Sequence, residues 1–224
     1  LSSGPKGGNI FFNGGIDKNN DGICDFNQSS YLQIHSWNFI TFIHEILHSL
    51  GLKHPHEVFD STDFEEGNSN KVSEEYDQYP YTIMSYNPLR DPNTNYSKYD
   101  GILLNSGIGG QFYPSSPMLF DVMAIQDMYG INKTNEPEDT IYSFDQGLPP
   151  FQSIYDTGGV DTLDLSFLTG GTQLNLEGNE ISTIGANYLL PFHDNEGAAT
   201  TYGTAQPSKF SIIAGTEIEK IYLP

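Results

Sequence analysis

The segment HEILHSLGLKH, residues 44–54, restricts the structure of this chain more than any other feature. His44 and His48 are four positions apart, so on a helix they lie on one face and can bind one metal ion. Gly51 ends the helix and permits a sharp turn that returns His54 as a third ligand. Three protein ligands leave one coordination position open for water, which is typical of catalytic zinc. The segment therefore predicts an active-site helix that carries one catalytic Zn2+.

Glu45 follows the first of these ligands directly. Its carboxylate can act as a general base toward a zinc-activated water, because the metal has already lowered the pKa of that water. Two alternatives to this three-histidine zinc site remain at this point. A buried helix can carry a histidine for packing alone, and His56 is an alternative ligand, although the spacing favours His54. The pattern predicts hydrolysis, with Glu45 first taking a proton and then passing it to the leaving group.

The spacing HExxHxxGxxH resembles the signature of the metzincin clan, and TIMSY, residues 82–86, looks like the Met-turn of that clan. The resemblance implies that Met84 lies beneath the metal as an apolar floor without binding it. It also implies that Tyr86 is a weak fifth zinc ligand that swings away and stabilises the tetrahedral intermediate. Taken alone, such residues are more often ordinary core and surface side chains.

Within that clan the chain resembles the serralysin family of secreted bacterial proteases. The segments that match are HEILHSLGLKHPH, YTIMSY, PMLFDVMAIQDMYGIN and IYDTGGVDTLDLS. The resemblance implies an extracellular zinc endopeptidase that hydrolyses internal peptide bonds of a protein or peptide substrate. It also implies that the substrate binds extended along an edge strand, for which we expect Asn9, Ile10, Phe11 and Phe12.

We expect an α+β fold with a boundary near residue 135. Residues 1–135 would form a metzincin zinc-protease domain, with a twisted mixed sheet over the active-site helix and a C-terminal subdomain with the Met-turn. Helical spacing predicts the active-site helix and a second amphipathic helix: the apolar positions are Trp37, Ile40, Ile43, Leu47 and Leu50, then Leu119, Val122, Ile125 and Met128. In residues 136–224 short apolar segments alternate with turns, which predicts a β-rich, β-roll-like segment.

The resemblance also implies parts that this sequence lacks. Serralysin-type domains have more strands before the active-site helix, and glycine-rich calcium repeats after the β-rich segment. We therefore expect either a fragment of a longer precursor, or a second chain or removed segment that completes the N-terminal sheet.

A first calcium site is implied by the resemblance at the junction with the β-rich segment. The positions that match are Asp156, Gly158, Gly159 and Asp161 in DTGGVD, with Glu219 as a partner carboxylate and Glu217 in place of a carbonyl donor. Calcium prefers such mixed oxygen ligands. The alternative is a tight Gly-Gly hairpin with solvated aspartates.

A second calcium site is predicted by the spacing D-x-N-x-D-G-x-x-D near the N-terminus. Asp17, Asn19 and Asp21 would supply side-chain oxygens, Ile23 its carbonyl and Asp25 a further carboxylate. The alternative is a polar hairpin loop, because these are ordinary turn residues. We expect one or more structural Ca2+ ions in total.

The composition excludes several functions. The formal net charge is −20, from 29 acidic and 9 basic side chains, so nucleic acid is not an expected partner. The single cysteine cannot form an intrachain disulfide, and no run reaches the roughly 18 apolar residues of a membrane helix. Two other readings remain open: a non-catalytic, calcium-dependent surface or S-layer-associated module derived from a protease, and a metallohydrolase that acts on something other than peptides.

Overall fold

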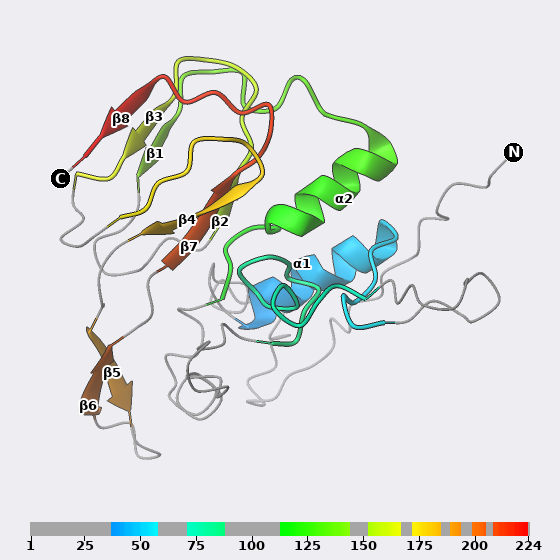
Figure 1. Ribbon diagram of the computed structural model, residues 1–224, viewed down its shortest axis with the longest axis vertical. Coiled ribbons are helices and arrows are strands. Elements are labelled where there is room, and N and C mark those ends of the chain that lie inside the picture. The colour runs from blue at the N-terminus through cyan, green and yellow to red at the C-terminus, as the bar shows by residue number, and fades with distance from the viewer. Residues whose placement is uncertain are drawn as a thin grey trace, which may run out of the picture.

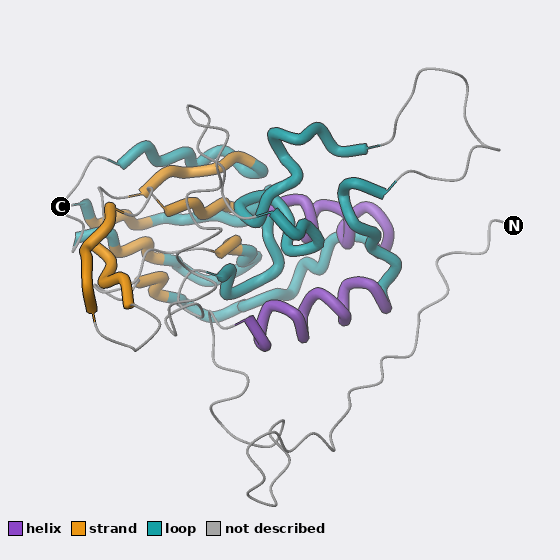
Figure 2. The backbone as a smooth tube through the Cα atoms, turned by 90° about the horizontal axis from the view of Figure 1, so that it is seen from below, coloured by secondary structure: helices purple, strands orange, loops and turns teal. Residues whose placement is uncertain are grey.

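The computed structural model has few helices and small sheets in its described residues, and the helices precede the strands along the chain. It describes residues 37–57, 71–87, 113–143, 152–166, 172–184, 189–193, 199–204 and 208–223. Figure 1 shows both helices on one side of the molecule and the strands on the other, and Figure 2 agrees from a second direction. Within these ranges, neither helix has the length and apolar character needed to cross a membrane.

Helix α1 spans Trp37–Ser49, which confirms that the segment with His44 and His48 is helical. It ends in two hydrogen bonds that reverse the chain: Leu52 N–H donates to the Leu47 carbonyl at 3.0 Å, and Gly51 N–H donates to the His48 carbonyl at 3.0 Å. This is a Schellman turn, which places a residue with positive φ just beyond the helix. Gly51 has a φ of 104°, so a residue with a side chain would be strained there.

Helix α2 spans Leu119–Tyr129 and lies beside α1 (Figure 1). The apolar side predicted for this helix is only partly buried. Leu119 is buried and Ile125 packs on the core, as expected, whereas Met128 is 36% exposed. The helix packs through its first two turns, and its last turn runs beyond the apolar cluster. Met128 is therefore a surface residue.

One apolar core joins α1, the loop of residues 79–84 and the start of α2. Its buried members are Ile40, Leu47, Leu52, Tyr79, Ile83, Met84, Tyr113 and Met118. A second core lies between the strands and contains Ile154, Leu163, Leu165, Phe210 and Ile212. The boundary predicted near residue 135 stays a prediction, although the two cores separate the chain on either side of that position.

Asp121 links α2 to the loop that precedes it, although its side chain is only 1% exposed. One carboxylate oxygen accepts the Thr82 hydroxyl at 2.5 Å, and the other accepts the N–H groups of Ile83 at 2.9 Å and Met118 at 2.8 Å. Burial raises the pKa of Asp121 to about 6, and these three hydrogen bonds oppose the rise. The loop of residues 82–84 is thus fixed to α2 through one buried acid.

In the described part of the chain, eight strands follow the helices and form three small sheets. They are β1 (Ile141–Ser143), β2 (Gln152–Ile154), β3 (Thr162–Asp164), β4 (Glu180–Ile184), β5 (Leu189–His193), β6 (Ala199–Thr204), β7 (Ser208–Ile212) and β8 (Lys220–Tyr222). The first sheet has the order β1-β3-β8 and is parallel throughout. In the second, of order β2-β7-β4, β2 runs parallel and β4 antiparallel to β7. Strands β5 and β6 form a separate antiparallel pair.

Strands occupy much of the segment that was predicted to be β-rich, and two details differ from what the sequence pattern suggests. Residues 172–178 make only a single bridge, between Gln173 and Thr183, instead of a strand. The pair β5 and β6 was not predicted, because Pro191 and Gly203 are residue types that count against strands. Since the described strands begin at Ile141, the expected sheet over α1 stays a prediction.

The buried acid gives a pH-dependent stability that can be measured. In the unfolded chain an aspartate has a pKa of 3.8, below the value of about 6 in the folded protein. Between about pH 4 and 6 the unfolded state loses its proton first, so the free energy of unfolding falls by up to about 3 kcal/mol as the pH rises. Urea unfolding of the metal-free protein should show this fall, and the fall should be smaller in Asp121→Asn. Parallel pH profiles for the two proteins would contradict the assignment.

Candidate metal centre

Three histidine side chains from two segments converge on one point. His44 and His48 come from one face of α1, and His54 comes from the chain that the Schellman turn reverses. The Nε2 atom of His54 lies 3.2 Å from that of His44 and 3.0 Å from that of His48. Tetrahedral zinc with Zn–N distances of about 2.0–2.1 Å requires its ligand atoms about 3.3 Å apart. The spacing therefore fits a single zinc ion.

The hydrogen bonds on the opposite ring nitrogens show which atoms are available to a metal. Each Nδ1 faces an oxygen: His44 faces the Ile83 carbonyl at 2.8 Å, His48 the Leu52 carbonyl at 2.9 Å and His54 the Glu57 carboxylate at 2.6 Å. These oxygens only accept, so each Nδ1 carries the proton and each Nε2 presents a lone pair. The lone pair of His54 lies about 3 Å from those of His44 and His48, and such lone pairs repel one another unless a cation lies between them. The donor set therefore fits a metal ion.

The electrostatic environment also favours neutral imidazole, the form that binds metal. His44 is only 7% exposed, and burial is the main cause that lowers its pKa. The neighbouring charges of His48 and His54 act in the same direction, whereas the hydrogen bond to Ile83 and the charge of Glu45 oppose them.

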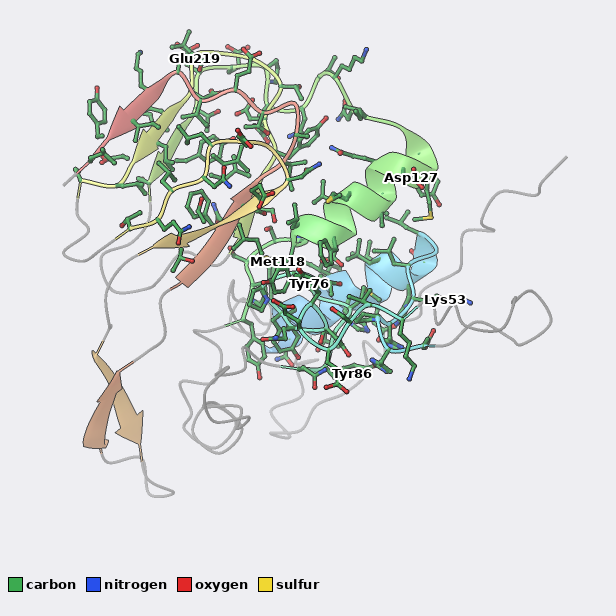
Figure 3. All side chains as sticks on the ribbon, in the orientation of Figure 1. Lys53, Tyr76, Tyr86, Met118, Asp127 and Glu219 are labelled. Atoms are coloured by element: carbon green, nitrogen blue, oxygen red, sulfur yellow. The ribbon has the colours of Figure 1, made fainter. Side chains whose placement is uncertain are left out.

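The other residues expected at the site lie close to these histidines. Glu45 is exposed on α1, one residue from buried His44. Met84 is 1% exposed within the core that α1 covers. Tyr86 is 57% exposed, and its hydroxyl lies 2.6 Å from His54 Nε2. Figure 3 shows Tyr86 on the outer side of the loop beside α1.

His56 lies next to the histidine cluster without joining it. Among the described residues, the group able to hold a metal consists of His44, His48 and His54. The His56 ring stacks on His54 with centroids 5.2 Å apart, and its Nδ1 lies 3.8 Å from Asp77 Oδ2. This placement disfavours the alternative in which His56 is the third ligand.

Sequence reasoning missed Glu57, the only side chain among the three Nδ1 acceptors. The hydrogen bond from His54 lowers the pKa of Glu57 and so favours its ionised form. A carboxylate three positions after the last expected ligand was a usable signal, because metal-binding histidines commonly donate their second nitrogen to a carboxylate.

The residues expected at the junction calcium site are only partly brought together. Asp156 and Asp161 are both buried, and Glu219 accepts the Asp161 N–H at 2.7 Å. Burial raises the pKa of Asp161, and the charges of Asp156 and Glu219 add to the rise. Glu217 is exposed, and no three carboxylates of the described residues lie close enough to bind one ion by themselves.

The alternative of a Gly-Gly hairpin is wrong, because β2 and β3, on either side of DTGGVD, belong to different sheets. Gly159 has a φ of 100°, and a Cβ there would lie 2.4 Å from the Glu138 carbonyl oxygen. The glycine is therefore required by close backbone packing, with or without calcium.

Two sets of expected residues lie outside the described ranges. They are the edge strand of Asn9, Ile10, Phe11 and Phe12, and the calcium loop of Asp17, Asn19, Asp21, Ile23 and Asp25.

Glu57 gives a direct test of the metal centre. Glu57→Ala should raise the dissociation constant for Zn2+ about 10-fold, because His54 loses the acceptor that orients its ring and increases its basicity. Competition with a chromogenic chelator measures the constant. Glu177→Ala, which removes an exposed carboxylate from the β-rich part, is the matched control. Equal affinities for the two variants would show that Glu57 has no role in holding His54.

Comparison with known proteins agrees with the motifs. No protein-family model matches the chain. Serralysin of Photorhabdus luminescens is 32% identical over 166 residues, which are 69% of this chain and 32% of that protein. Metalloprotease AprA of Pseudomonas entomophila is 32% identical over 161 residues, 65% of this chain and 30% of the relative. Serralysin C of Dickeya chrysanthemi is 31% identical over 157 residues, again 65% of this chain and 30% of the relative.

The chain thus spans about a third of the length of the curated relatives that it matches. The resemblance predicted from the histidine motif and the Met-turn is confirmed by these matches. With its three convergent histidines, this chain is serralysin-like.

Proposed function

We propose that this chain is the zinc-binding, catalytic part of an extracellular endopeptidase that hydrolyses internal bonds of protein or peptide substrates. The observation that carries the proposal is the convergence of three Nε2 lone pairs beside the Tyr86 hydroxyl. Serralysin-like sequence over two thirds of the chain supports the choice of peptide as substrate. Its resemblance to a secreted family also supports the extracellular location.

His44, His48 and His54 would hold the zinc ion, and their Nδ1 hydrogen bonds keep the three rings in place. When bound, zinc polarises the substrate carbonyl and lowers the pKa of water. Buried Met84 supports the loop beneath the histidines through apolar contacts with α1.

Glu45 is the proposed general base and then the acid that protonates the leaving amine. It is exposed and one residue from a ligand, so its carboxylate can reach water and substrate on the open side of the site. Such positioned proton transfer contributes about 10²- to 10⁴-fold to rates.

Tyr86 is the proposed donor to the developing oxyanion and a weak ligand in the resting state. Its hydroxyl lies 2.6 Å from His54 Nε2, within the ligand cluster, while more than half of the side chain is exposed. The phenol can therefore leave the cluster without first displacing a packed core. A single oxyanion donor supplies about 10²- to 10³-fold.

We also propose that calcium binds at Asp156, Asp161 and Glu219, with carbonyl oxygens near Gly158, Gly159 and Glu217. The buried carboxylates of Asp156 and Asp161 and that of Glu219, which accepts the Asp161 N–H, repel one another, and a divalent cation would remove that repulsion. The calcium loop at Asp17 to Asp25, the edge strand at residues 9–12 and a segment or second chain that completes the N-terminal sheet stay predictions.

Casein hydrolysis tests the proposed enzyme. The zinc-loaded protein should cleave casein, lose activity with a chelator and regain it when Zn2+ is restored. Glu45→Ala should lower kcat about 10³-fold, because the proton acceptor is gone, and should leave zinc content unchanged. Glu177→Ala is the control for loss of an exposed carboxylate.

Cleavage retained by Glu45→Ala would exclude the proposed mechanism. If the wild type binds zinc but cleaves neither casein nor a peptide panel, the alternative of a non-catalytic module gains support.

Calcium removal tests the junction site. At a calcium concentration of 100 times Kd, binding should stabilise the fold by about 2.7 kcal/mol, so Tm should rise with added Ca2+. Asp161→Asn should abolish most of this rise, whereas Asp127→Asn, on the exposed side of α2, should keep it. Thermal unfolding with and without a calcium chelator measures the difference. An unchanged Tm in the wild type would exclude a stabilising calcium ion.

A further inference from the structure

Tyr86 is held at the histidine cluster by its neighbours more than by its own packing. The side chain is 57% exposed, yet its hydroxyl lies 2.6 Å from His54 Nε2 and its ring stacks on that of His44. An exposed side chain that must reach one atom needs a fixed backbone. Ser85, the preceding residue, is only 1% exposed, so the backbone is anchored immediately before Tyr86.

A small hydrogen-bond network ties both neighbours of Tyr86 to residues 77–79. The Ser85 hydroxyl donates to Asp77 Oδ1 at 2.6 Å and accepts the Asn87 N–H at 2.9 Å. The Asn87 side-chain amide donates to the Asp77 carbonyl at 3.0 Å, and the Tyr79 N–H donates to the Asn87 carbonyl at 3.0 Å. The Ser85 hydroxyl therefore serves as donor and acceptor at once. Tyr86 lies between Ser85 and Asn87 in the chain, so the network holds the residue on each side of it.

We propose that the Asp77–Ser85 pair is a positioning device for Tyr86: it fixes the backbone on both sides of the tyrosine and so aims the phenol at the metal centre. The inference rests on the proposed function of Tyr86. Asp77 is only 8% exposed, so its carboxylate is a fixed acceptor instead of a mobile surface group.

A second buried acid, Asp121, also holds the loop that carries Tyr86. Asp121 binds the first part of this loop and Asp77 binds the part next to Tyr86. Asp121 binds Thr82 and Ile83, and the Ile83 carbonyl accepts His44 Nδ1, so Asp121 supports the histidine side. Asp77 binds Ser85, directly before Tyr86. Loss of Asp77 should therefore change the tyrosine contact while leaving the histidine ligands in place.

The chemistry of the contact distinguishes three variants. Ser85→Ala removes the oxygen that both donates and accepts, and Asp77→Ala removes the acceptor. Asp77→Asn keeps an amide oxygen that can accept the Ser85 hydroxyl, and its NH2 group would face His56, whose Nδ1 lies 3.8 Å from Asp77 Oδ2. The conservative variant should therefore rescue most of the function.

The first readout does not depend on catalysis. In the copper(II)-substituted full chain, a phenolate-to-copper charge-transfer absorption reports contact between Tyr86 and the metal, and Tyr86→Phe should abolish it. Ser85→Ala and Asp77→Ala should lose most of the band, and Asp77→Asn should retain it. If Asp77→Ala does not fold, Ser85→Ala, which removes one oxygen atom, carries the test. Full retention of the band in Ser85→Ala would overturn the proposal, as would loss in Asp77→Asn equal to that in Asp77→Ala.

The second readout is a double-mutant cycle on casein hydrolysis. Ser85→Ala should lower kcat about 10-fold at unchanged KM and zinc content. This loss is smaller than the rate enhancement of about 10²-fold or more that one oxyanion donor supplies, because the phenol is still present but less well placed. In a Tyr86→Phe background it should cause no further loss, because both changes act through one phenol. An equal loss in both backgrounds would show a merely structural role and overturn the proposal. If the wild type shows the copper band but does not hydrolyse casein, the proposed endopeptidase activity is refuted and this inference stands. If the wild type lacks the band, Tyr86 is not a metal ligand and this inference is refuted.

Discussion

The Nε2 atom of His54 lies 3.2 Å from that of His44 and 3.0 Å from that of His48, and this convergence is the constraint on which the helical part of the molecule depends. Such a cluster of lone pairs forms only if each ring is held from its other nitrogen. Two of the acceptors are backbone carbonyls, of Ile83 and Leu52, and they come from the loop after α1 and from the Schellman turn. The turn, the loop and the helix must therefore all be in place before the site exists.

Two buried carboxylates keep that loop in place, and both carry an energetic cost. Asp121 is almost fully buried, with a raised pKa, yet it accepts three hydrogen bonds, and the two from Thr82 and Ile83 join the loop to α2. Asp77 accepts from Ser85 at the other end of the loop. Removing either acceptor would leave buried donors unsatisfied, which explains why polar groups occupy positions inside an otherwise apolar core. Their positions agree with separate roles for the histidine side and the tyrosine side of the proposed site.

The β-rich segment is held together differently, because parallel strands that are distant in sequence pair side by side. Strand β3 pairs with both β1 and β8, and the DTGGVD loop crosses from one sheet to the other. The loop brings Asp156 and Asp161 into the interior, where their neighbours are backbone donors such as Gly158 N–H and Thr140 N–H. Local alternation of apolar residues predicts that strands exist here, but it carries no information on which strands pair. Long-range pairing is decided by packing of residues such as Leu163 and Phe210 in a common core.

The sequence alone determined helix α1, its end before Gly51 and the histidine spacing, because each depends on residues within a few positions of one another. It also determined the family resemblance, through several short motifs of this kind. It also indicated Met84 and Tyr86, through their place in a motif. Glu57 had a local signal in its distance from His54, but the roles of Asp77 and Asp121 became visible only in the tertiary structure, since nothing within a few positions of either acid separates it from a solvated one. Their roles depend on partners that folding brings together: an imidazole nitrogen for Glu57, a serine hydroxyl for Asp77, and the Thr82 hydroxyl with the Ile83 amide for Asp121. Tertiary structure decided the contacts of Asp77 and Asp121 because a buried carboxylate is tolerated only where the fold supplies its donors.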